Sequence, residues 1–310
     1  MKFKNNISKK IALFAPVIFI LACASNANNE WDKELGYTYA NDENTLLWEI
    51  SGNGLKKPSY LYGTIHIKNK KVFEYDTIVS YLFNYADVYA MEISMDEVNP
   101  IKAAKWMMME QDIKNYLSEE EYKKLDSFLF VNTNTKLESI SKQKPFFISS
   151  LMAESLFGGD MKFALDLDFY MKAKMNKKEV MGIEKFEEQM AAVDSMTIRE
   201  QIELLFESIN DTVNPIEQAE KMISTYTSGN LKELMVLINE YSENEKFQRI
   251  FITNRNHRMA NRIAQNNKSK SYFNAIGAAH LPGEAGVIEL LKKKGFNVKP
   301  IKTEFKKQSK

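Results

Sequence analysis

The sequence predicts an α/β fold in which one mixed sheet is built from the N-terminal and C-terminal parts of the chain, with flanking helices and a mostly helical middle insertion. Short apolar, β-prone runs lie near both ends, whereas apolar residues between about 100 and 248 recur mostly at helical spacing. A Gly-x-x-His frame follows one such run in each half of the chain. Open α/β sheets place their chemistry just past the ends of buried strands, so this pattern supports the same fold class.

The first 22 residues have the pattern of an export signal. A lysine-rich start precedes an apolar run, 11–22, that is short for a membrane span. The only cysteine, Cys23, ends the sequence Ile20-Leu21-Ala22-Cys23, which resembles a lipobox whose cysteine is lipidated and becomes the mature N-terminus. The alternative is ordinary secretion with cleavage nearby. Both predict an exported protein, and lipidation predicts a lipoprotein anchored in a membrane, on its periplasmic or cell-surface side.

Beyond the signal, we expect a tether over 23–44, a single α/β domain over 45–303 and a lysine-rich tail over 304–310. One cysteine cannot form a disulfide within the chain, so stability must come from an apolar core, which 44% hydrophobic residues can supply. The chain carries a net charge of +1, and four of its lysines lie in the signal, which leaves −3 on the remainder. This charge gives no indication of a nucleic-acid partner.

The N-terminal elements are predicted to be a hairpin, a helix and a strand. Residues 46–50 alternate in polarity, a Ser-Gly-Asn-Gly turn follows, and the strand pattern resumes over 59–67. Helical spacing of apolar residues predicts a helix over 72–83. The run 87–93 is a strongly apolar strand that contains one acid in its apolar part, Glu92.

The middle of the chain is predicted to be mostly helical from about 100 to 248, with one strand in it. Ser118 and Glu121 form a capping box at a helix start. A short strand over 179–184 ends on a second acid, Glu184. The further elements that we expect are helices over 146–156, 166–175, 254–265 and 283–293, and strands over 272–276 and 296–301.

Two of the three histidines share the Gly-x-x-His frame, Gly63–His66 and Gly277–His280. Glycine three residues before each histidine allows a tight turn at a strand end and a close approach of the backbone. Two imidazoles in matching settings are most simply a composite site, such as a metal site. The alternative is a pair of core histidines bonded to backbone carbonyls. The helix expected after His280 would also direct N–H groups toward an anion.

Two acids at strand ends are further candidates. Glu92 is either a metal ligand or a general base, which with the two histidines would give a two-histidine, one-carboxylate set, or it is the partner of an arginine such as Arg255. Glu184 ends its strand in the same way and is a candidate ligand. Asp166 lies near the start of a helix and either caps it or reaches the cleft. His257 lies in a polar run and is expected at the surface.

These blocks, taken in order, resemble the TraB/GumN family, which is related to the TIKI metalloproteases. The resemblance runs from about Leu46 to Ile301 and covers Leu47-Trp48-Glu49-Ile50, the two Gly-x-x-His frames, Met91-Glu92, Leu165-Asp166, Gly182-Ile183-Glu184 and Arg255-Asn256. Ala164 stands where the family usually has glycine, and no candidate ligand is affected. No zincin helix, nucleophile elbow, P-loop or dinucleotide fingerprint is present in the sequence.

The resemblance implies a fold of the type shared with erythromycin esterase and haem-binding ChaN-like proteins, and a site of two histidines and a glutamate. We therefore predict a divalent-metal-dependent hydrolase acting on peptides or proteins. The catalytic set is His66, Glu92, His280 and Arg255, and the metal, Mn²⁺, Co²⁺ or Zn²⁺, is held by His66, Glu92, His280 and Glu184. Arg255 and Asn256 are assigned to substrate binding. The alternative is a haem- or metal-binding lipoprotein without turnover.

Overall fold

The computed structural model describes residues 35–156, 159–210, 214–241, 244–266 and 268–306. The chain divides into two compact units, Met1–Gly36 and Tyr37–Lys310, and the sheet and the candidate site belong to the second. The predicted signal and the lipidation site at Cys23 lie outside the described residues. Within the described ranges, every helix is too short or too polar to cross a membrane.

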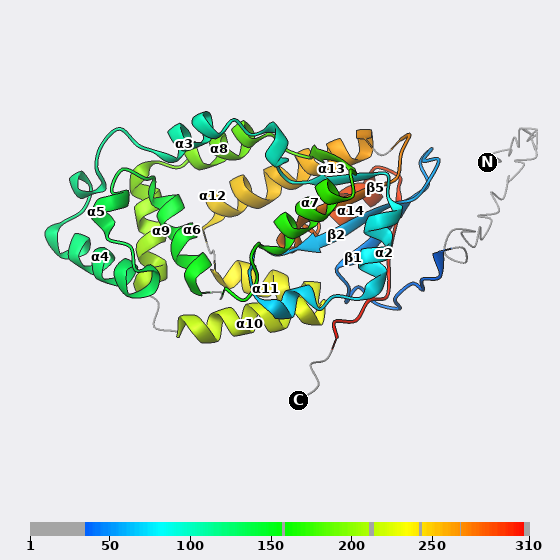
Figure 1. The fold of residues 1–310 in the computed structure, drawn as a ribbon, viewed down its shortest axis with the longest axis horizontal. Helices are drawn as coiled ribbons and strands as arrows, with labels where there is room; N and C mark the ends of the chain where they lie inside the picture. The colour runs from blue at the N-terminus through cyan, green and yellow to red at the C-terminus, as the bar shows by residue number, and fades with distance from the viewer. Residues whose placement is uncertain (1–34, 157–158, 211–213, 242–243, 267, 307–310) are drawn as a thin grey trace, which may run out of the picture. The chain divides into compact units, whose positions relative to one another are not determined.

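Six strands form one mixed sheet in the order β4-β3-β5-β2-β1-β6 (Figure 1). The four neighbours β4, β3, β5 and β2 run parallel, and β1 pairs antiparallel with both β2 and β6. The predicted fold class is confirmed, since β1 to β3 come from the N-terminal part and β5 and β6 from the C-terminal part. The strands are β1 (Leu47–Ser51), β2 (Ser59–Thr64), β3 (Val88–Met91), β4 (Glu179–Gly182), β5 (Tyr272–Gly277) and β6 (Asn297–Pro300).

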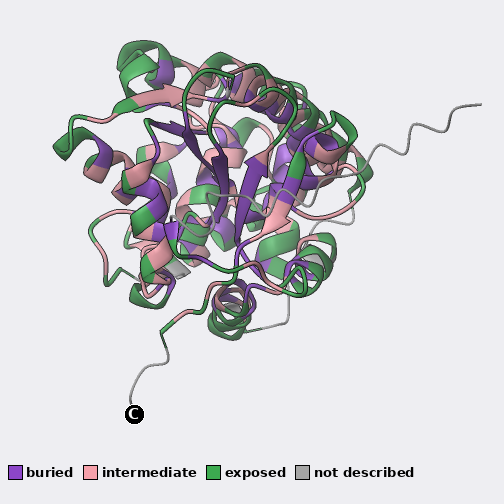
Figure 2. Cartoon of the chain, turned by 90° about the vertical axis from the view of Figure 1, so that its right-hand side faces the viewer, coloured by how far each residue is buried: buried purple, intermediate pink, exposed green. Residues whose placement is uncertain are grey.

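Helices surround the strands and make up most of the middle of the chain (Figures 1 and 2). The α-helices are α2 (Thr77–Tyr85), α3 (Pro100–Met107), α4 (Glu119–Thr133), α5 (Leu137–Ile140), α6 (Pro145–Leu156), α7 (Leu165–Met175), α8 (Phe186–Asp194), α9 (Ile198–Asn210), α10 (Pro215–Ser228), α11 (Leu231–Tyr241), α12 (Glu245–Phe247), α13 (Asn254–Asn266) and α14 (Val287–Lys293). The shorter turns are η1 (Lys70–Phe73), η2 (Met95–Glu97), η3 (Ile113–Asn115), the π-helical η4 (Gln248–Thr253) and η5 (Ala278–His280).

Local sequence fixes the ends of several helices. The Ser118 hydroxyl accepts the N–H of Glu121, whose carboxylate accepts the N–H of Ser118, so the predicted capping box begins α4. Asp76 caps α2 through the N–H of Ile78. Gly229 ends α10 with a φ of 70°, a left-handed conformation that glycine adopts at little cost. These short-range signals mark where the helices begin and end.

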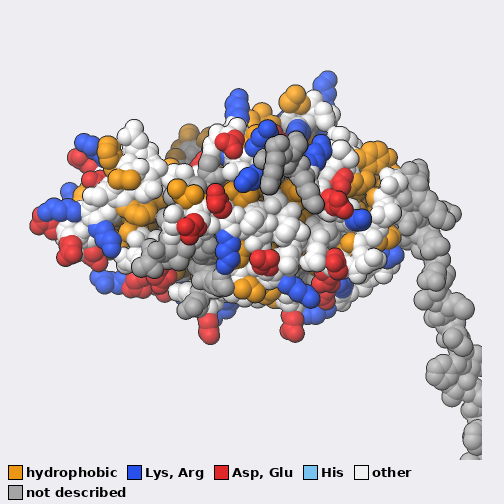
Figure 3. Space-filling model, turned by 90° about the horizontal axis from the view of Figure 1, so that it is seen from below, with side chains coloured by type: hydrophobic (Ala, Val, Ile, Leu, Met, Phe, Trp, Pro, Cys, Tyr) orange, Lys and Arg blue, Asp and Glu red, His pale blue; other side chains and the backbone are white. Residues whose placement is uncertain are grey.

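The core divides into a sheet-centred part and a helical part. Rings of Tyr62, Phe83, Phe169 and Phe273 contact one another where α7 packs on the parallel strands. The four central strands β3, β5, β2 and β1 are nearly all buried, whereas the edge strands β4 and β6 are largely not (Figure 2). A second cluster, which includes Leu125, joins α4, α6 and α9. On the outside, acidic and basic side chains are interspersed over the face drawn in Figure 3. The helical middle therefore carries its own apolar core beside the sheet.

The helix after His280 begins later than predicted. α14 starts at Val287 rather than near residue 283, because Pro282 and Gly283 turn the chain first. Gly283 has a φ of +87°, and the N–H of Gly286 bonds to its carbonyl at 2.9 Å. The N–H groups at the start of α14 are thus four residues farther from the histidine along the chain than the sequence indicated.

The folded unit also includes residues that the sequence assigns to the tether and the tail. Tyr39 forms an antiparallel bridge with Ile301. The N–H of Lys306 bonds to the carbonyl of Glu74 at 2.8 Å. Residues 39 and 306 are therefore both tied to the folded unit by backbone hydrogen bonds.

Candidate active site

The four parallel strands end at one edge of the sheet, and each is followed by a polar candidate residue. In the register, Met91 lies opposite both Gly182 and Ala275, and Thr64 lies opposite Gly277. Parallel strands in register bring the residues that follow them to the same edge. Across the sheet from β4 to β2, these residues are Glu184, Glu92, His280 and His66.

Glu92 is held by the backbone and by two side chains. Its Oε1 accepts the N–H of Gly277 at 2.7 Å, and its Oε2 accepts from Arg255 Nη2 at 2.5 Å and from Gln189 Nε2 at 3.2 Å. Burial raises the pKa of Glu92, but the positive charges of Arg255 and of His280 when protonated, together with the Gly277 N–H, outweigh it and lower the pKa to about 2. The carboxylate is therefore ionised at neutral pH.

The carboxylate of Glu184 forms ion pairs with two arginines. Its side chain is 0% exposed, its Oε2 accepts from Arg255 Nε at 2.8 Å and Nη2 at 2.7 Å, and its Oε1 accepts from Arg258 Nη1 at 2.9 Å. Arg255 thus bridges Glu92 and Glu184, which realises the ion-pair interpretation of Glu92. The carboxylates that Arg255 binds in this structure are those of Glu92 and Glu184.

His280 is buried and has a defined tautomer. Asn256 Nδ2 donates to the carbonyl of Ala285 at 2.8 Å, so its Oδ1 faces His280 Nδ1 at 2.6 Å. Because this oxygen can only accept, Nδ1 carries the proton and Nε2 carries a lone pair. Nε2 lies 3.8 Å from Glu92 Oε1. Burial lowers the pKa of His280 to about 4, so the ring is neutral at pH 7.

His66 repeats this arrangement at the surface. Its side chain is 74% exposed, and its Nδ1 lies 3.1 Å from Asp166 Oδ1 in the first turn of α7. The hydrogen bond to Asp166 raises the pKa of His66, against a smaller lowering by burial. The Tyr89 hydroxyl donates to the Asp166 carbonyl at 2.9 Å, which fixes this turn. Asp166 therefore reaches the site rather than capping its helix.

The two glycines of the Gly-x-x-His frames are needed for close packing. A Cβ on Gly277 would lie 3.1 Å from Glu92 Oε1 and 3.4 Å from His280 Cδ2. A Cβ on Gly63 would lie 2.7 Å from the side chain of Leu281, directly after the second histidine. The two frames thus pack against each other, and Gly277 leaves room for the carboxylate that its own N–H binds.

The predicted four-ligand set does not form one cluster. Within the described part of the chain, no three His, Cys, Asp or Glu side chains lie close enough to hold one ion. Glu92 and His280 converge, Glu184 bonds to arginines, and His66 bonds to Asp166. Asn256, which was predicted to bind substrate, is bonded to His280 Nδ1.

Gln189 is a site residue that the sequence interpretation left without a role. Its Nε2 lies 3.2 Å from both Glu92 Oε2 and Glu184 Oε2, so it donates between the two carboxylates. The available signal was its place on α8, five residues after Glu184. His257 is exposed, as expected.

Comparison with known proteins identifies the family of this chain. The model of the TraB/PrgY/gumN family matches residues 46–300. The chain belongs to the TraB/PrgY/gumN family. Relatives include Metalloprotease TIKI1 of Danio rerio (24% identity, 84% of this chain, 64% of the relative), Metalloprotease TIKI homolog of Nematostella vectensis (23%, 84% and 68%) and Metalloprotease TIKI1 of Homo sapiens (23%, 82% and 61%). The match thus spans only about two thirds of these relatives. No solved structure matches significantly.

The names of these relatives raise the question of whether this TraB/PrgY/gumN protein can hold a metal. His280 Nε2 and Glu92 Oε1 face each other across 3.8 Å, and both carry lone pairs at neutral pH. Asn256 fixes the other ring nitrogen, which is the support that a metal-bound histidine usually has. Imidazole and carboxylate are suitable ligands for a divalent cation. The chemistry of this pair therefore fits a metal with two protein ligands.

His280, which is buried, and Glu92, whose side chain is 26% exposed, make the stability of this TraB/PrgY/gumN protein sensitive to acid. The folded-state pKa of His280, about 4, lies below its ordinary value of 6.5, so its contribution is present above pH 6.5 and is lost as the pH falls toward 4. Glu92 acts in the same direction between about 4.5 and 2. Between pH 6.5 and pH 4 the free energy of unfolding of the wild type should fall. With chelator present, we expect His280→Asn to make this fall smaller by about 3 kcal/mol. Urea unfolding at each pH measures this free energy. Parallel plots of unfolding free energy against pH for the wild type and the variant would contradict the lowered pKa of His280.

Proposed function

We propose that this protein is an exported peptidase that depends on a divalent metal held by Glu92 and His280. One observation carries the proposal. In both Gly-x-x-His frames, Nδ1 is bonded to a side-chain oxygen, of Asp166 for His66 and of Asn256 for His280, which leaves both Nε2 atoms for chemistry. The similarity to metalloproteases supports a metal-dependent hydrolase, and the Mn²⁺, Co²⁺ or Zn²⁺ identity and the peptide substrate stay part of the proposal.

The pKa values separate the roles of the two acid–base groups. A carboxylate with a pKa of about 2 is a weak base, so Glu92 suits a ligand better than a proton acceptor. His66 has a raised pKa, an exposed ring and a carboxylate behind it, which are the properties of a general base. His66 would take the proton of the attacking water on Nε2, while Asp166 stabilises the imidazolium. A bound divalent cation would polarise the scissile carbonyl and acidify water.

Arg255 and Gln189 support this proposal as positioning residues. They hold the Glu92 side chain in one orientation, with Oε2 bound and Oε1 directed toward His280. The predicted role of Arg255 and Asn256 in substrate binding is replaced in this proposal by support of Glu92 and His280. Export of the chain and a membrane anchor at Cys23 would bring the site into contact with peptides outside the cytoplasm.

Metal titration of three histidine variants tests the proposal. With Mn²⁺, Co²⁺ and Zn²⁺ offered separately, His280→Asn should weaken metal binding by at least about 100-fold, because it keeps a donor for Asn256 but removes Nε2. His66→Asn should retain the metal and slow peptide cleavage by roughly 10²–10⁴-fold. His257→Asn, on the exposed side of α13, should match the wild type in both measurements.

Each assignment has its own contrary outcome. Loss of the metal in the His66 variant would make that histidine a ligand and remove its role as base. Cleavage that persists after complete removal of metal would end the metal-dependent proposal. Stoichiometric binding of metal or haem without cleavage of any peptide would favour the alternative of a binding lipoprotein.

A further inference from the structure

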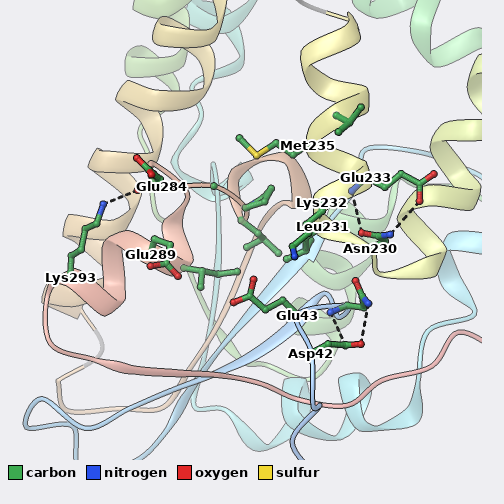
Figure 4. A pocket seen from close by; sticks show the side chains of 16 residues that line it. Asp42, Glu43, Asn230, Leu231, Lys232, Glu233, Met235, Glu284, Glu289 and Lys293 are labelled. Carbon is green, nitrogen blue, oxygen red and sulfur yellow. Dashed lines mark hydrogen bonds between the residues drawn. The ribbon is translucent and has the colours of Figure 1, made fainter.

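A pocket of about 1340 Å³ lies beside the second Gly-x-x-His frame (Figure 4). Its walls are residues 42–44, the N-terminal half of α11, the loop 281–284 and α14. The segment 42–44 precedes β1, and Leu47 pairs with Tyr62 near the end of β2. The pocket therefore lies at the same edge of the sheet as His66, Glu92 and His280, and none of these three residues lines it.

The pocket shares structural parts with both frames. Leu281 forms part of its wall, and a Cβ on Gly63 would lie 2.7 Å from this leucine. α11 contacts η5, the turn that carries His280. The Met235 side chain of α11 packs on Gly283, where a Cβ would lie 2.7 Å from Met235 Cε. A chain segment seated in the pocket would therefore press on the loop that follows His280.

The side chains around the pocket carry mainly negative charge. Five of the lining residues are acidic, and only two are lysines. Glu43 and Glu289 both pair with Lys292, whereas Asp42, Glu233 and Glu284 form no ion pair with any described residue. Figure 4 shows that the acidic side chains come from the segment before β1, from α11, from the loop 281–284 and from α14. Such a rim attracts cations and repels anions.

The remainder of the lining is largely apolar. It comes from α11, the loop 281–284 and α14, and on α11 the side chains of Met235 and Val236 are 38% and 54% exposed. Exposed apolar side chains inside an acidic rim suit a ligand that is itself apolar and positively charged. A polypeptide segment in which lysine or arginine alternates with apolar residues has this chemistry.

We propose that the pocket binds a cationic, apolar segment of the polypeptide substrate and so selects basic substrates. The proposal rests on the proposed function for its substrate, but binding in the pocket requires neither metal nor turnover.

Peptide binding under chelator separates this proposal from catalysis. The probe is a short fluorescent peptide that alternates leucine with lysine, and its partners have glutamine or glutamate in place of lysine. Fluorescence anisotropy with the full chain should show binding of the lysine peptide about tenfold tighter than that of the glutamine peptide, and weakest binding of the glutamate peptide. The double variant Glu233→Gln/Glu284→Gln should reduce this preference by about fivefold or more.

Matched variants establish where the effect arises. Glu120→Gln removes the same charge from an exposed position on α4 and should leave the preference unchanged. Val236→Lys adds a positive charge at a half-exposed position of the wall and should abolish binding of the lysine peptide. Thermal melting of each variant confirms that it is folded.

Three outcomes would overturn the proposal: equal affinity for the three peptides, an unchanged preference in the double variant, or the same loss in Glu120→Gln. Binding of spermine without any selectivity among the peptides would also overturn it, since it would show a simple cation site. Peptide binding with the expected preference and no cleavage under any metal would support the pocket while refuting the peptidase function.

Discussion

Replacing Arg255 with methionine is expected to lower the free energy of unfolding by about 3–5 kcal/mol, because it leaves two carboxylates without their shared cation. The Arg255 side chain is 11% exposed, and it bonds to Glu92 and to Glu184, whose side chain is 0% exposed. Removing one partner of a buried ion pair costs more than the pair contributes, since the remaining charge stays desolvated. Urea unfolding at pH 7 measures the loss, and the pKa of Glu92 should rise.

Two variants control for this effect. Arg258→Met removes a cation that also bonds to Glu184 but is 30% exposed, and it should cost about 1 kcal/mol. The triple variant Arg255→Met/Glu92→Gln/Glu184→Gln leaves no buried charge unpaired and should recover most of the loss. A cost below 1 kcal/mol for Arg255→Met alone would mean that the two carboxylates do not depend on this arginine.

The strand ends were predictable from the sequence because they depend on short-range patterns. Apolar runs closed by Glu92 and Glu184, and the glycines before His66 and His280, are visible without any tertiary information. Once the runs are accepted as parallel strands, their ends must meet at one edge of the sheet. The matching Gly-x-x-His frames and the strand-end glutamates already suggested one composite site, and the resemblance to a family assigned His66, Glu92 and His280 to it.

Arg255 was one of the predicted alternatives for Glu92, but the other partners of these residues were not predictable, because they depend on side-chain directions between elements. Arg255 and Asn256 are neighbours on α13, and about 100° separates neighbouring residues around a helix. They therefore contact different groups, Arg255 the two glutamates and Asn256 the ring of His280. Gln189 lies on another helix, and its bond to Glu92 crosses 97 residues of sequence.

The start of α14 was also not predictable from the sequence. Gly283 and Gly286 were compatible with the first turn of a helix, but a φ of +87° at Gly283 ends any helical path there. At Gly286, a Cβ would lie 2.2 Å from the Pro282 carbonyl oxygen, so only glycine fits this turn. Periodicity alone does not reveal such a turn. The loop so formed lies against Met235, in the wall of the pocket that we propose binds basic segments.

The Glu92→Gln variant is expected to lower metal-dependent peptide cleavage by on the order of 10³-fold, since it removes a charge at the reacting centre with almost no change in shape. The amide cannot offer acceptors to both Gly277 and Arg255, so some stability is lost as well. Glu188→Gln provides the matched control. Hydrogen bonds from Arg262 lower the pKa of Glu188 to about 2 as well, but Glu188 contacts neither histidine. Both variants should therefore be destabilised, and only Glu92→Gln should lose cleavage. Equal loss of cleavage in the two variants would show that activity follows stability rather than the charge of Glu92.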